Sequence, residues 1–400
     1  MRPLLLIIRT GKREFREYLL RSITPHYRVH MFVTVAPDWE IDYIDGYTRV
    51  DTADIDAMIK AAQDLEGLQG VMTWDEARIV QTAEVAAALG LPGDPAATAR
   101  CRDKHQTRQA LGAAGVAQPR STKVESLDEA LAEAERLGYP VIIKPTDLAL
   151  SHGVVKVENA QALAEAYAYV HTLTHGGNPD WKPQTLIEEL VTGEEISVDS
   201  AVHRGEIFPL CLAHKEVGYE PYCIEVGHYV FGDEPLLRDP QLLGLLRDTH
   251  KALGFTDGIT HTEIMLTATG PKIIEVNGRL GGDMIPYLGL RSSGVDVGLA
   301  AAAVACDKAP QVERDRALVA GVRFFYPEQD NTAIHELSFE FDQKPAAMDL
   351  LTGLATPGVV KSPPPRGTVN GRIAFATAVG ASRDECRSAL DAAEKALRYS

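Results

Sequence analysis

The stretch GITHTEIMLTATGPKIIEVNGRLGGD, residues 258–283, alternates apolar residues with residues that are costly to bury. This alternation predicts two β-strands joined by a turn at residues 268–270. In that register Glu263 and Glu275 lie six residues on either side of Thr269, so they face each other directly. Like charges directly opposite each other destabilise a sheet. A divalent cation between the two carboxylates would remove that penalty.

The polar residues around this hairpin indicate which cation. Strand periodicity places Asn277 and Arg279 on the same face as Glu275. Oxygen ligands from Glu263, Glu275 and Asn277 suit magnesium, which usually shares phosphate oxygens, and Arg279 would lie near those phosphates. The alternative is a hairpin edge facing solvent, where such groups cost little. Backbone held close to a ligand, favoured by glycines at 278, 281 and 282, supports the first interpretation.

The composition of the whole chain narrows the class of protein. Its 400 residues suit roughly two to four lobes, and 45% apolar and 24% charged residues are typical of a globular protein. A net charge of −16 argues against a nucleic-acid partner. Five cysteines without a CxxC pair argue against a zinc ribbon or a disulfide framework.

Membrane and export signals are weak in this sequence. The longest apolar run, VGLAAAAVAC, has about half the length that a bilayer requires. The N-terminal MRPLLLIIRT lacks a long apolar region and a small-residue cleavage site, so it predicts a first buried strand rather than a signal peptide. We therefore expect a cytoplasmic protein without a membrane partner.

Short apolar runs separated by helical segments predict a small parallel α/β lobe over residues 1–97, ending near the turn-rich LGLPGDP. A helix at RDKHQTRQALGAAG opens a second unit, residues 98–183, with a capped helix at SLDEALAEAERLG and a strand at YPVIIKP. Residues 184–310 are rich in strands and include the opening hairpin. Residues 311–400 predict a smaller β-rich lobe closed by a helix.

Magnesium and phosphates together suggest a nucleotide, although Walker and Rossmann glycine motifs are absent. Lys104 lies at the start of a predicted helix, where a solvated lysine is equally reasonable. Lys144 ends a buried strand, so it either extends to the surface or pairs with an anion. The loop TDLALSHGVV that follows, with Ser151 and Gly153, is free to fold over phosphates.

The segment IEELVTGEE places Glu188 and Glu195 on either side of a turn at Gly193. A carboxylate at such a turn can accept hydrogen bonds from both hydroxyls of a ribose, and an extended segment can offer backbone groups to a base. Taken alone, however, this cluster of glutamates is also typical of a solvated sheet edge.

The order of these features resembles that of ATP-grasp enzymes over residues 1–310. Within that superfamily the chain looks most similar to bacterial L-amino-acid (dipeptide) ligases of the bacilysin-synthase type. This closer resemblance rests on CIEVGHYV (223–230), on EVNGRLGGD, and on a C-terminal lobe with GVVKSPPPRG. It implies an ATP-grasp fold of mixed α/β and α+β class, with an N-terminal Rossmann-like parallel lobe, two ATP-clamping subdomains and a C-terminal β-rich lobe.

The resemblance also implies a reaction. Such enzymes join a carboxylate to an amine, making dipeptides in secondary metabolism, at the expense of ATP. An acylphosphate forms first with release of ADP, and an amine then displaces phosphate to give an amide. The expected cofactors are ATP and a pair of magnesium ions, with manganese as an alternative ion. The expected partners are small carboxylate and amine substrates, no nucleic acid, and a second copy in a homodimer.

The residue roles carried over from this resemblance are as follows. The α- and β-phosphates would be held by Lys104 and Lys144, and covered by a lid of Ser151, His152 and Gly153. The adenine hinge would be Glu188, Glu189 and Leu190, and the ribose would bind Glu195. Magnesium would be held by Glu263, Glu275 and Asn277. Arg279 would stabilise the acylphosphate and the oxyanion, and the amino-acid site would contain Glu225 and His228.

Several alternatives stay open at this point. His228 is either the base that accepts the amine proton or a satisfied histidine of the core, and Glu225 can instead pair with a substrate ammonium. The C-terminal lobe carries no residue that we can assign to chemistry and would complete the pocket wall. Alternative functions are an ATP-grasp ligase or carboxylase for other substrates, or a catalytically silent ATP-binding regulator. A silent regulator should have lost Glu275, Asn277 or Arg279, and all three are present.

Overall fold

The computed structural model describes residues 2–146, 148, 152–172 and 184–400. The N-terminal lobe is a parallel sheet in the order β3-β2-β1-β4. Its strands are β1 (Leu4–Ile8), β2 (Arg28–Val33), β3 (Gly46–Arg49) and β4 (Leu68–Met72), and its helices are α1 (Arg13–Ile23), α2 (Ile55–Gln63) and α3 (Ile79–Ala88). Every residue of β1 is buried, which confirms the predicted first strand. Strand β3, a short strand at the edge of the sheet, was not among the predicted elements.

The second sheet is antiparallel, in the order β5-β8-β6-β7. Its elements are β5 (Ser121–Val124), α6 (Leu127–Leu137), β6 (Val141–Pro145), β7 (Val155–Val157), α7 (Ala160–Thr172) and β8 (Thr185–Glu189). The predicted cap of α6 is present, because the Ser126 hydroxyl accepts the backbone N–H of Glu129. Two helices, α4 (Pro95–Arg102) and α5 (Lys104–Ala113), connect this sheet to the N-terminal lobe.

The largest sheet has eight strands in the order β13-β12-β9-β10-β11-β14-β19-β17. Its strands are β9 (Glu194–His203), β10 (Glu206–Gly218), β11 (Ile224–Phe231), β12 (Gly258–Thr267), β13 (Gly270–Asn277), β14 (Val319–Phe325), β17 (Met348–Gly353) and β19 (Ala374–Gly380). In the hairpin of β12 and β13, Glu263 lies opposite Glu275 as predicted. Nearer the turn the pairing is shifted by one residue, with Thr267 opposite Gly270 and Ile264 opposite Ile273, so that Ile274 is an extra residue in β13. Helix α8 (Pro240–Leu253) begins at its predicted cap, Asp239.

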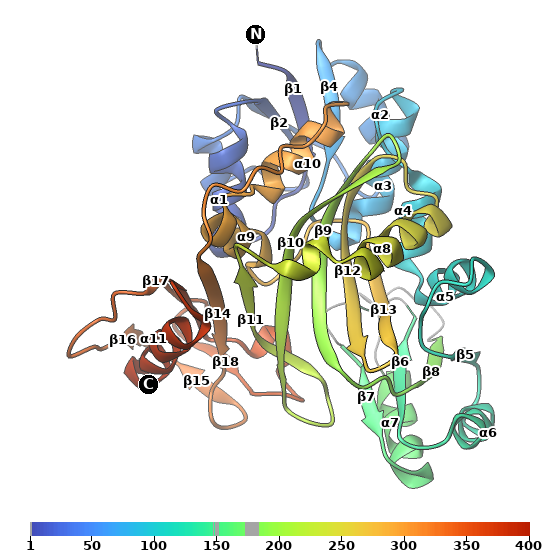
Figure 1. Cartoon of the computed structure of the whole chain (residues 1–400). Helices are drawn as coiled ribbons and strands as arrows, with labels where there is room; N and C mark the ends of the chain where they lie inside the picture. Colours follow the sequence, from blue (N-terminus) through green and yellow to red (C-terminus); the bar gives the residue numbers. More distant parts are fainter. Residues whose placement is uncertain (1, 147, 149–151, 173–183) are drawn as a thin grey trace.

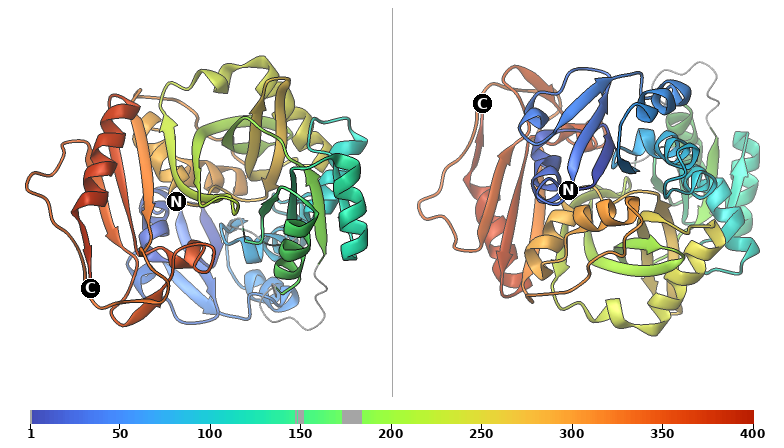
Figure 2. Two further views of the ribbon diagram at one scale, coloured as in Figure 1. Left: turned by 90° about the horizontal axis from the view of Figure 1, so that it is seen from below. Right: turned by 90° about the horizontal axis from the view of Figure 1, so that it is seen from above.

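The C-terminal residues extend this same sheet through β14, β19 and β17. Further elements here are β15 (Thr332–Ile334), β16 (Leu337–Phe339), β18 (Val359–Lys361), α11 (Arg383–Ala396) and β20 (Leu397–Tyr399). Figures 1 and 2 show these elements, in red, and the sheet of β5 to β8, in green, on opposite sides of the long strands of the central sheet. The central strands therefore have a separate lobe on each side.

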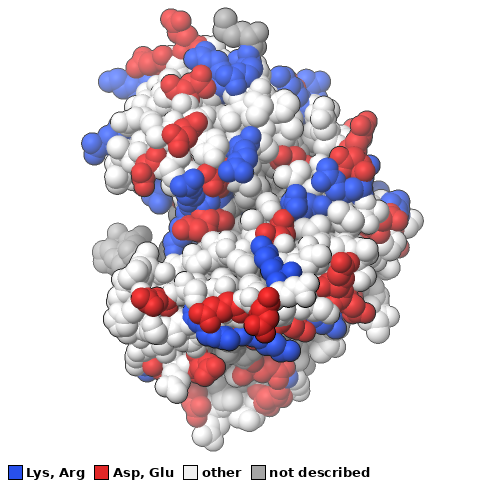
Figure 3. All heavy atoms as spheres, turned by 90° about the vertical axis from the view of Figure 1, so that its left-hand side faces the viewer, with Lys and Arg blue, Asp and Glu red and all other residues white. Residues whose placement is uncertain are grey.

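Helices α9 (Ile285–Ser293) and α10 (Val297–Ala305) follow the opening stretch and join the apolar core shared with β1 and β2. Within the described residues, no single helix is long and apolar enough to cross a membrane, and α9 with α10 reaches that length only as a pair bent by 107°. On the face drawn in Figure 3, acidic and basic side chains are intermixed.

Candidate active site

A pocket lies between the sheet of β5 to β8 and the strands β12 and β13. Part of its lining is apolar, with Ile142 from one sheet and Met265 and Ile274 from the other. The lining also includes many of the residues singled out in the sequence, most of them charged. These are Lys104, Lys144, Glu188, Glu189, Leu190, Glu195, Glu225, Glu263, Glu275, Asn277 and Arg279.

The described pocket lining does not include the residues predicted to form the phosphate lid, nor the histidine predicted to accept the amine proton. Ser151 lies outside the described residues. The pocket lining as described contains Leu148 and Val154 but neither His152 nor Gly153. His228 is fully buried and lies behind the pocket wall instead of lining it. The roles of these residues remain predictions.

Both lysines predicted to bind phosphates are buried against carboxylates. The Lys104 ammonium lies 3.1 Å from Glu275 on β13 and also donates to the carbonyl of Leu148. The Lys144 ammonium lies 2.6 Å from Glu188. Burial lowers the pKa of Lys144, and the attraction of Glu188 offsets only part of that effect. Each lysine is therefore held in place within the pocket by an acidic partner.

Arg108 on α5 was not predicted as a site residue, yet it lies next to one. Its guanidinium binds Glu188 at 2.7 Å and donates to the backbone carbonyls of Ile273 and Ile274 on β13. Burial would raise the pKa of Glu188, but Arg108 and Lys144 outweigh it and lower that pKa to about 2. The Glu188 carboxylate is thus paired with two cations. Only the backbone of this segment is then left to contact a nucleobase, which is the role predicted for it. Arg108 could have been found from the sequence, because it follows Lys104 by four residues and therefore lies on the same face of α5.

Lys215 on β10 is a second residue that was missed, and it organises the acidic end of the pocket. Its side chain is 1% exposed, and its ammonium lies 2.8 Å from Glu195, 2.7 Å from Glu225 and 3.0 Å from Glu263. Burial alone would lower the pKa of Lys215, but the three carboxylates raise it well above its usual value. Three carboxylates around one ammonium leave an excess of negative charge, which favours a divalent cation nearby.

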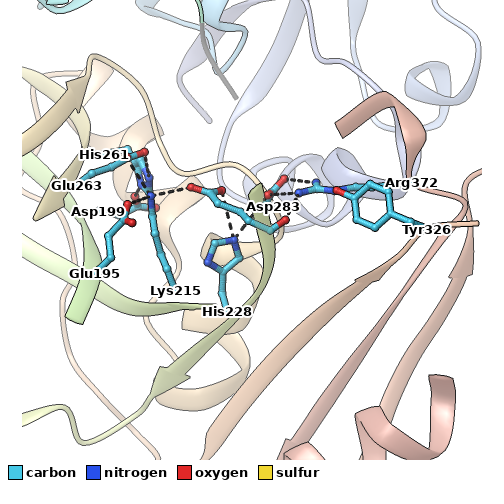
Figure 4. A network of polar contacts seen from close by, with 10 residues as sticks. Glu195, Asp199, Lys215, His228, His261, Glu263, Asp283, Tyr326 and Arg372 are labelled. Carbon is cyan, nitrogen blue, oxygen red and sulfur yellow. Dashed lines mark hydrogen bonds and ion pairs between the residues drawn. The ribbon is translucent and has the colours of Figure 1, made fainter. Parts of the chain in front are cut away.

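His261 and Asp199 lie beside this cluster (Figure 4). The His261 ring is hydrogen-bonded to the fully buried Asp199 at 2.7 Å, and its other nitrogen lies 3.7 Å from Glu263. Burial would lower the pKa of His261, but the hydrogen bond to Asp199 raises it to about 9. Asp199 also accepts the backbone N–H of Gly281 at 3.0 Å. One buried carboxylate thus fixes both the histidine and the loop after β13.

Arg279 is anchored by the N-terminal lobe. Its guanidinium lies 2.5 Å from Glu76, in the short helix η2 (Glu76–Arg78), and Glu76 also contacts Arg102 at 3.3 Å. Burial would lower the pKa of Arg279, but Glu76 outweighs this effect and raises it. The arginine therefore stays charged and is held from behind while it lines the pocket.

Glu225 and His228 come together because β11 contains a β-bulge. Glu225 pairs with Val217 and Gly227 with Glu216, so Val226 is an extra residue. Glu225 and His228 consequently share a side of the strand, and the histidine lies 3.7 Å from Glu225 and 3.6 Å from Asp283. Within the described residues neither ring nitrogen of His228 has a hydrogen-bond partner. Its interpretation as a satisfied core histidine therefore lacks the expected partners.

The oxygen donors in the pocket fit a magnesium ion. Glu263 and Glu275 are opposite one another, and Asn277, opposite His261 in the same ladder, lines the pocket with them. Carboxylate and amide oxygens without sulfur or several imidazoles are the ligands that magnesium prefers. The residues predicted from the hairpin pattern are therefore compatible with that ion.

Residues 137–287 match the family model of the ATP-grasp domain. The chain contains an ATP-grasp domain. Its curated relatives include alanine–anticapsin ligase of Bacillus subtilis strain 168, 27% identical over 58% of this chain and 53% of the relative. Another is an uncharacterised protein, y4rH, of Sinorhizobium fredii strain NBRC 101917 / NGR234, 29% identical over 72% of this chain and 60% of the relative. These matches thus span little more than half of each relative.

Solved structures share the ATP-grasp fold along the whole chain. An L-amino acid ligase from Bacillus licheniformis superposes with a TM-score of 0.80 at 21% identity, covering 100% of this chain and 98% of that one. Phosphoribosylglycinamide synthetase from Anaerococcus prevotii superposes with a TM-score of 0.75 at 20% identity and covers 100% of both chains. The expected mixed ATP-grasp architecture is thereby confirmed, as is the resemblance to homologues of the bacilysin-synthase type.

Proposed function

We propose that this protein is an ATP-dependent ligase that joins the carboxylate of one amino acid, or a similar acid, to the amine of another through an acylphosphate. The observation that carries this proposal is one pocket combining two buried lysines, two facing carboxylates and a charged arginine inside an ATP-grasp domain. Phosphoryl transfer depends mainly on positioning and charge neutralisation, which these residues supply without a protein nucleophile.

The chemistry of the pocket lining supports one orientation of the nucleotide. The apolar walls around Ile142, Met265 and Ile274 suit a purine ring, next to the backbone of Glu189 and Leu190. Lys104 on α5 and Lys144 on β6 line the same pocket, and their ammonium groups suit the phosphates. Glu263, Glu275 and Asn277 would hold magnesium, which when bound neutralises the charge of the phosphate oxygens. Arg279 adds positive charge where the γ-phosphate and the acid substrate would meet.

The amine substrate suits the acidic end of the pocket. Glu225, His228 and Asp283 each offer one acceptor atom, and these atoms lie within 4.8 Å of one another. A primary ammonium has three N–H donors in a tetrahedral arrangement, so three convergent acceptors match it. His228 lies 3.7 Å from Glu225 and 3.6 Å from Asp283, and it would accept a proton from an ammonium held by them, because the attack requires the free amine.

The test is phosphate release from ATP and magnesium with the twenty amino acids in pairs, followed by mass detection of products. A pair that releases phosphate and gives the mass of both acids minus water supports the ligase and names its substrates. Phosphate release with one acid alone supports acylphosphate formation and directs the search to other amines. ATP binding without turnover across the panel would contradict the proposal for amino acids.

A further inference from the structure

Arg372 from the C-terminal residues reaches the rim of the candidate site without lining the pocket. It is 2% exposed, and its guanidinium binds both carboxylate oxygens of Asp283, at 2.6 and 2.7 Å. It also donates to the backbone carbonyl of Glu225 at 3.1 Å and to the Tyr326 hydroxyl at 3.2 Å, and lies 3.6 Å from the centre of the Phe324 ring. All of its contacts therefore converge on the wall beside Glu225 and Asp283.

The loop that Arg372 holds has a strained backbone. Asp283 and Met284 have φ values of +48° and +65°, in the left-handed region that residues other than glycine rarely adopt. Such a conformation persists when surrounding contacts over-determine it, and it is common at functional sites. A two-pronged guanidinium–carboxylate pair fixes the direction of Asp283 as well as its charge.

Arg372 contacts both residues whose carboxylates lie next to His228. Asp283 and Glu225 are the two carboxylates around His228, at 3.6 and 3.7 Å. Arg372 contacts the side chain of one and the backbone of the other, while Lys215 holds the Glu225 side chain at 2.7 Å. Without the Arg372 guanidinium, Asp283 would lose both of its hydrogen bonds to that group and could move. The backbone carbonyl of Glu225 on β11 would lose a donor as well.

We propose that Arg372 is a positioning residue that sets recognition of the amine substrate by holding Asp283 and Glu225 around His228. This inference rests on the proposed function and makes the C-terminal lobe part of the substrate site. Arg372 acts through the two carboxylates and does not touch the reacting atoms. A substrate with a primary ammonium depends on it, whereas the nucleotide, bound at the other end of the pocket, does not.

The test compares Arg372→Met, Arg372→Lys and the control Arg323→Met in the full-length protein. Arg323 is also in the C-terminal lobe and pairs with two carboxylates, Asp391 at 2.6 Å and Glu394 at 3.0 Å, instead of with Asp283. For Arg372→Met we expect the KM of the amine substrate to rise between about ten- and a hundred-fold, with the KM of ATP within about twofold. Arg372→Lys keeps the charge but loses the fork, so its effect should be intermediate.

Hydrogen exchange gives a second readout that needs no turnover. In Arg372→Met, the amides of residues 280–288 and 224–229 should exchange faster than in the unaltered protein, with unchanged ADP affinity. Tyr326→Phe, a milder change, should shift the same amides less. Unchanged exchange there, or an equal loss of ATP and amine affinity, would overturn the proposal. If the unaltered protein makes no amide at all, the proposed function fails, and the exchange experiment still decides whether Arg372 positions this wall.

Discussion

Glu263 and Glu275 lie directly opposite each other, yet each contacts a different lysine, Lys215 at 3.0 Å and Lys104 at 3.1 Å. Such pairs are costly to bury unless every charge has a partner. The pocket satisfies that condition with alternating acidic and basic groups, each fixed by a neighbouring strand or helix. At the residue scale, the site is a set of charges already oriented before any ligand enters.

Arg279 is the residue whose loss should affect chemistry most selectively. We expect Arg279→Ala to lower kcat by about a hundred- to a thousand-fold, because a charged donor to the developing oxyanion is lost. Nucleotide affinity, measured by calorimetry with ADP, should change little. Arg102→Ala is the control, since Arg102 also contacts Glu76 but leaves Arg279 in place. Near-normal turnover of Arg279→Ala would contradict its assignment.

His261 should make stability depend on pH. Its pKa is raised to about 9 by Asp199, above the value of about 6.5 in an unfolded chain. Protonated His261 therefore stabilises the folded state, with its full contribution below about pH 6.5. This contribution is lost as the pH rises through about 9. Relative to His261→Gln, the free energy of unfolding should therefore fall by up to about 3 kcal/mol over that range. The measurement is urea unfolding without magnesium or nucleotide, and parallel pH curves for the two proteins would refute this prediction.

At the scale of elements, the ion pair of Arg108 and Glu188 joins α5 to β8, and Arg108 reaches β13 through two carbonyls. Lys144 on β6 binds the same carboxylate. The buried cluster of Arg108, Lys144 and Glu188 thus connects the two sheets that enclose the pocket, at the end proposed for the nucleotide. Helix α5 also carries Lys104, so the cluster sets the position of both lysines.

We expect Arg108→Met to destabilise the protein by about 3 to 5 kcal/mol, because it leaves Glu188 buried with one cation instead of two. It should also weaken nucleotide binding, since Lys144 shares that carboxylate. Arg136→Met is the matched control: it breaks an exposed pair with Glu133, whose arginine is 59% exposed, and should cost less than about 1 kcal/mol. Equal losses of stability for the two variants, measured by urea unfolding, would show that the buried cluster has no special role.

Local pairings were predictable from the sequence, and distant ones were not. The pairing of Glu263 with Glu275 was predicted from a nearby turn, although it also depends on an extra residue, Ile274, that the pattern did not indicate. The cap of α6 follows from four consecutive residues. The anchoring of Arg279 by Glu76, and of Asp283 by Arg372, joins residues far apart in the chain. Neither spacing nor periodicity carries that information. The bulge at Val226, which brings His228 to Glu225, is likewise invisible in a strict alternation.

At the scale of the whole molecule, three regions meet at one pocket. The N-terminal lobe supplies Glu76 behind Arg279, the two sheets supply the lysines and carboxylates, and the C-terminal lobe supplies Arg372. Because strands β14, β19 and β17 continue the central sheet, the C-terminal lobe has a continuous hydrogen-bonded connection to β11. Its position relative to Glu225 is therefore fixed by the sheet itself.

The most direct test of the proposed acylphosphate follows an oxygen atom. Once the amino-acid pair is known, the acid substrate is labelled with ¹⁸O in its carboxylate, and the released phosphate is analysed by mass spectrometry. If the carboxylate attacks the γ-phosphate, one labelled oxygen per turnover must appear in phosphate, because the amine displaces it from the acyl carbon. Unlabelled phosphate accompanying amide formation would contradict the acylphosphate and, with it, the assigned role of Arg279.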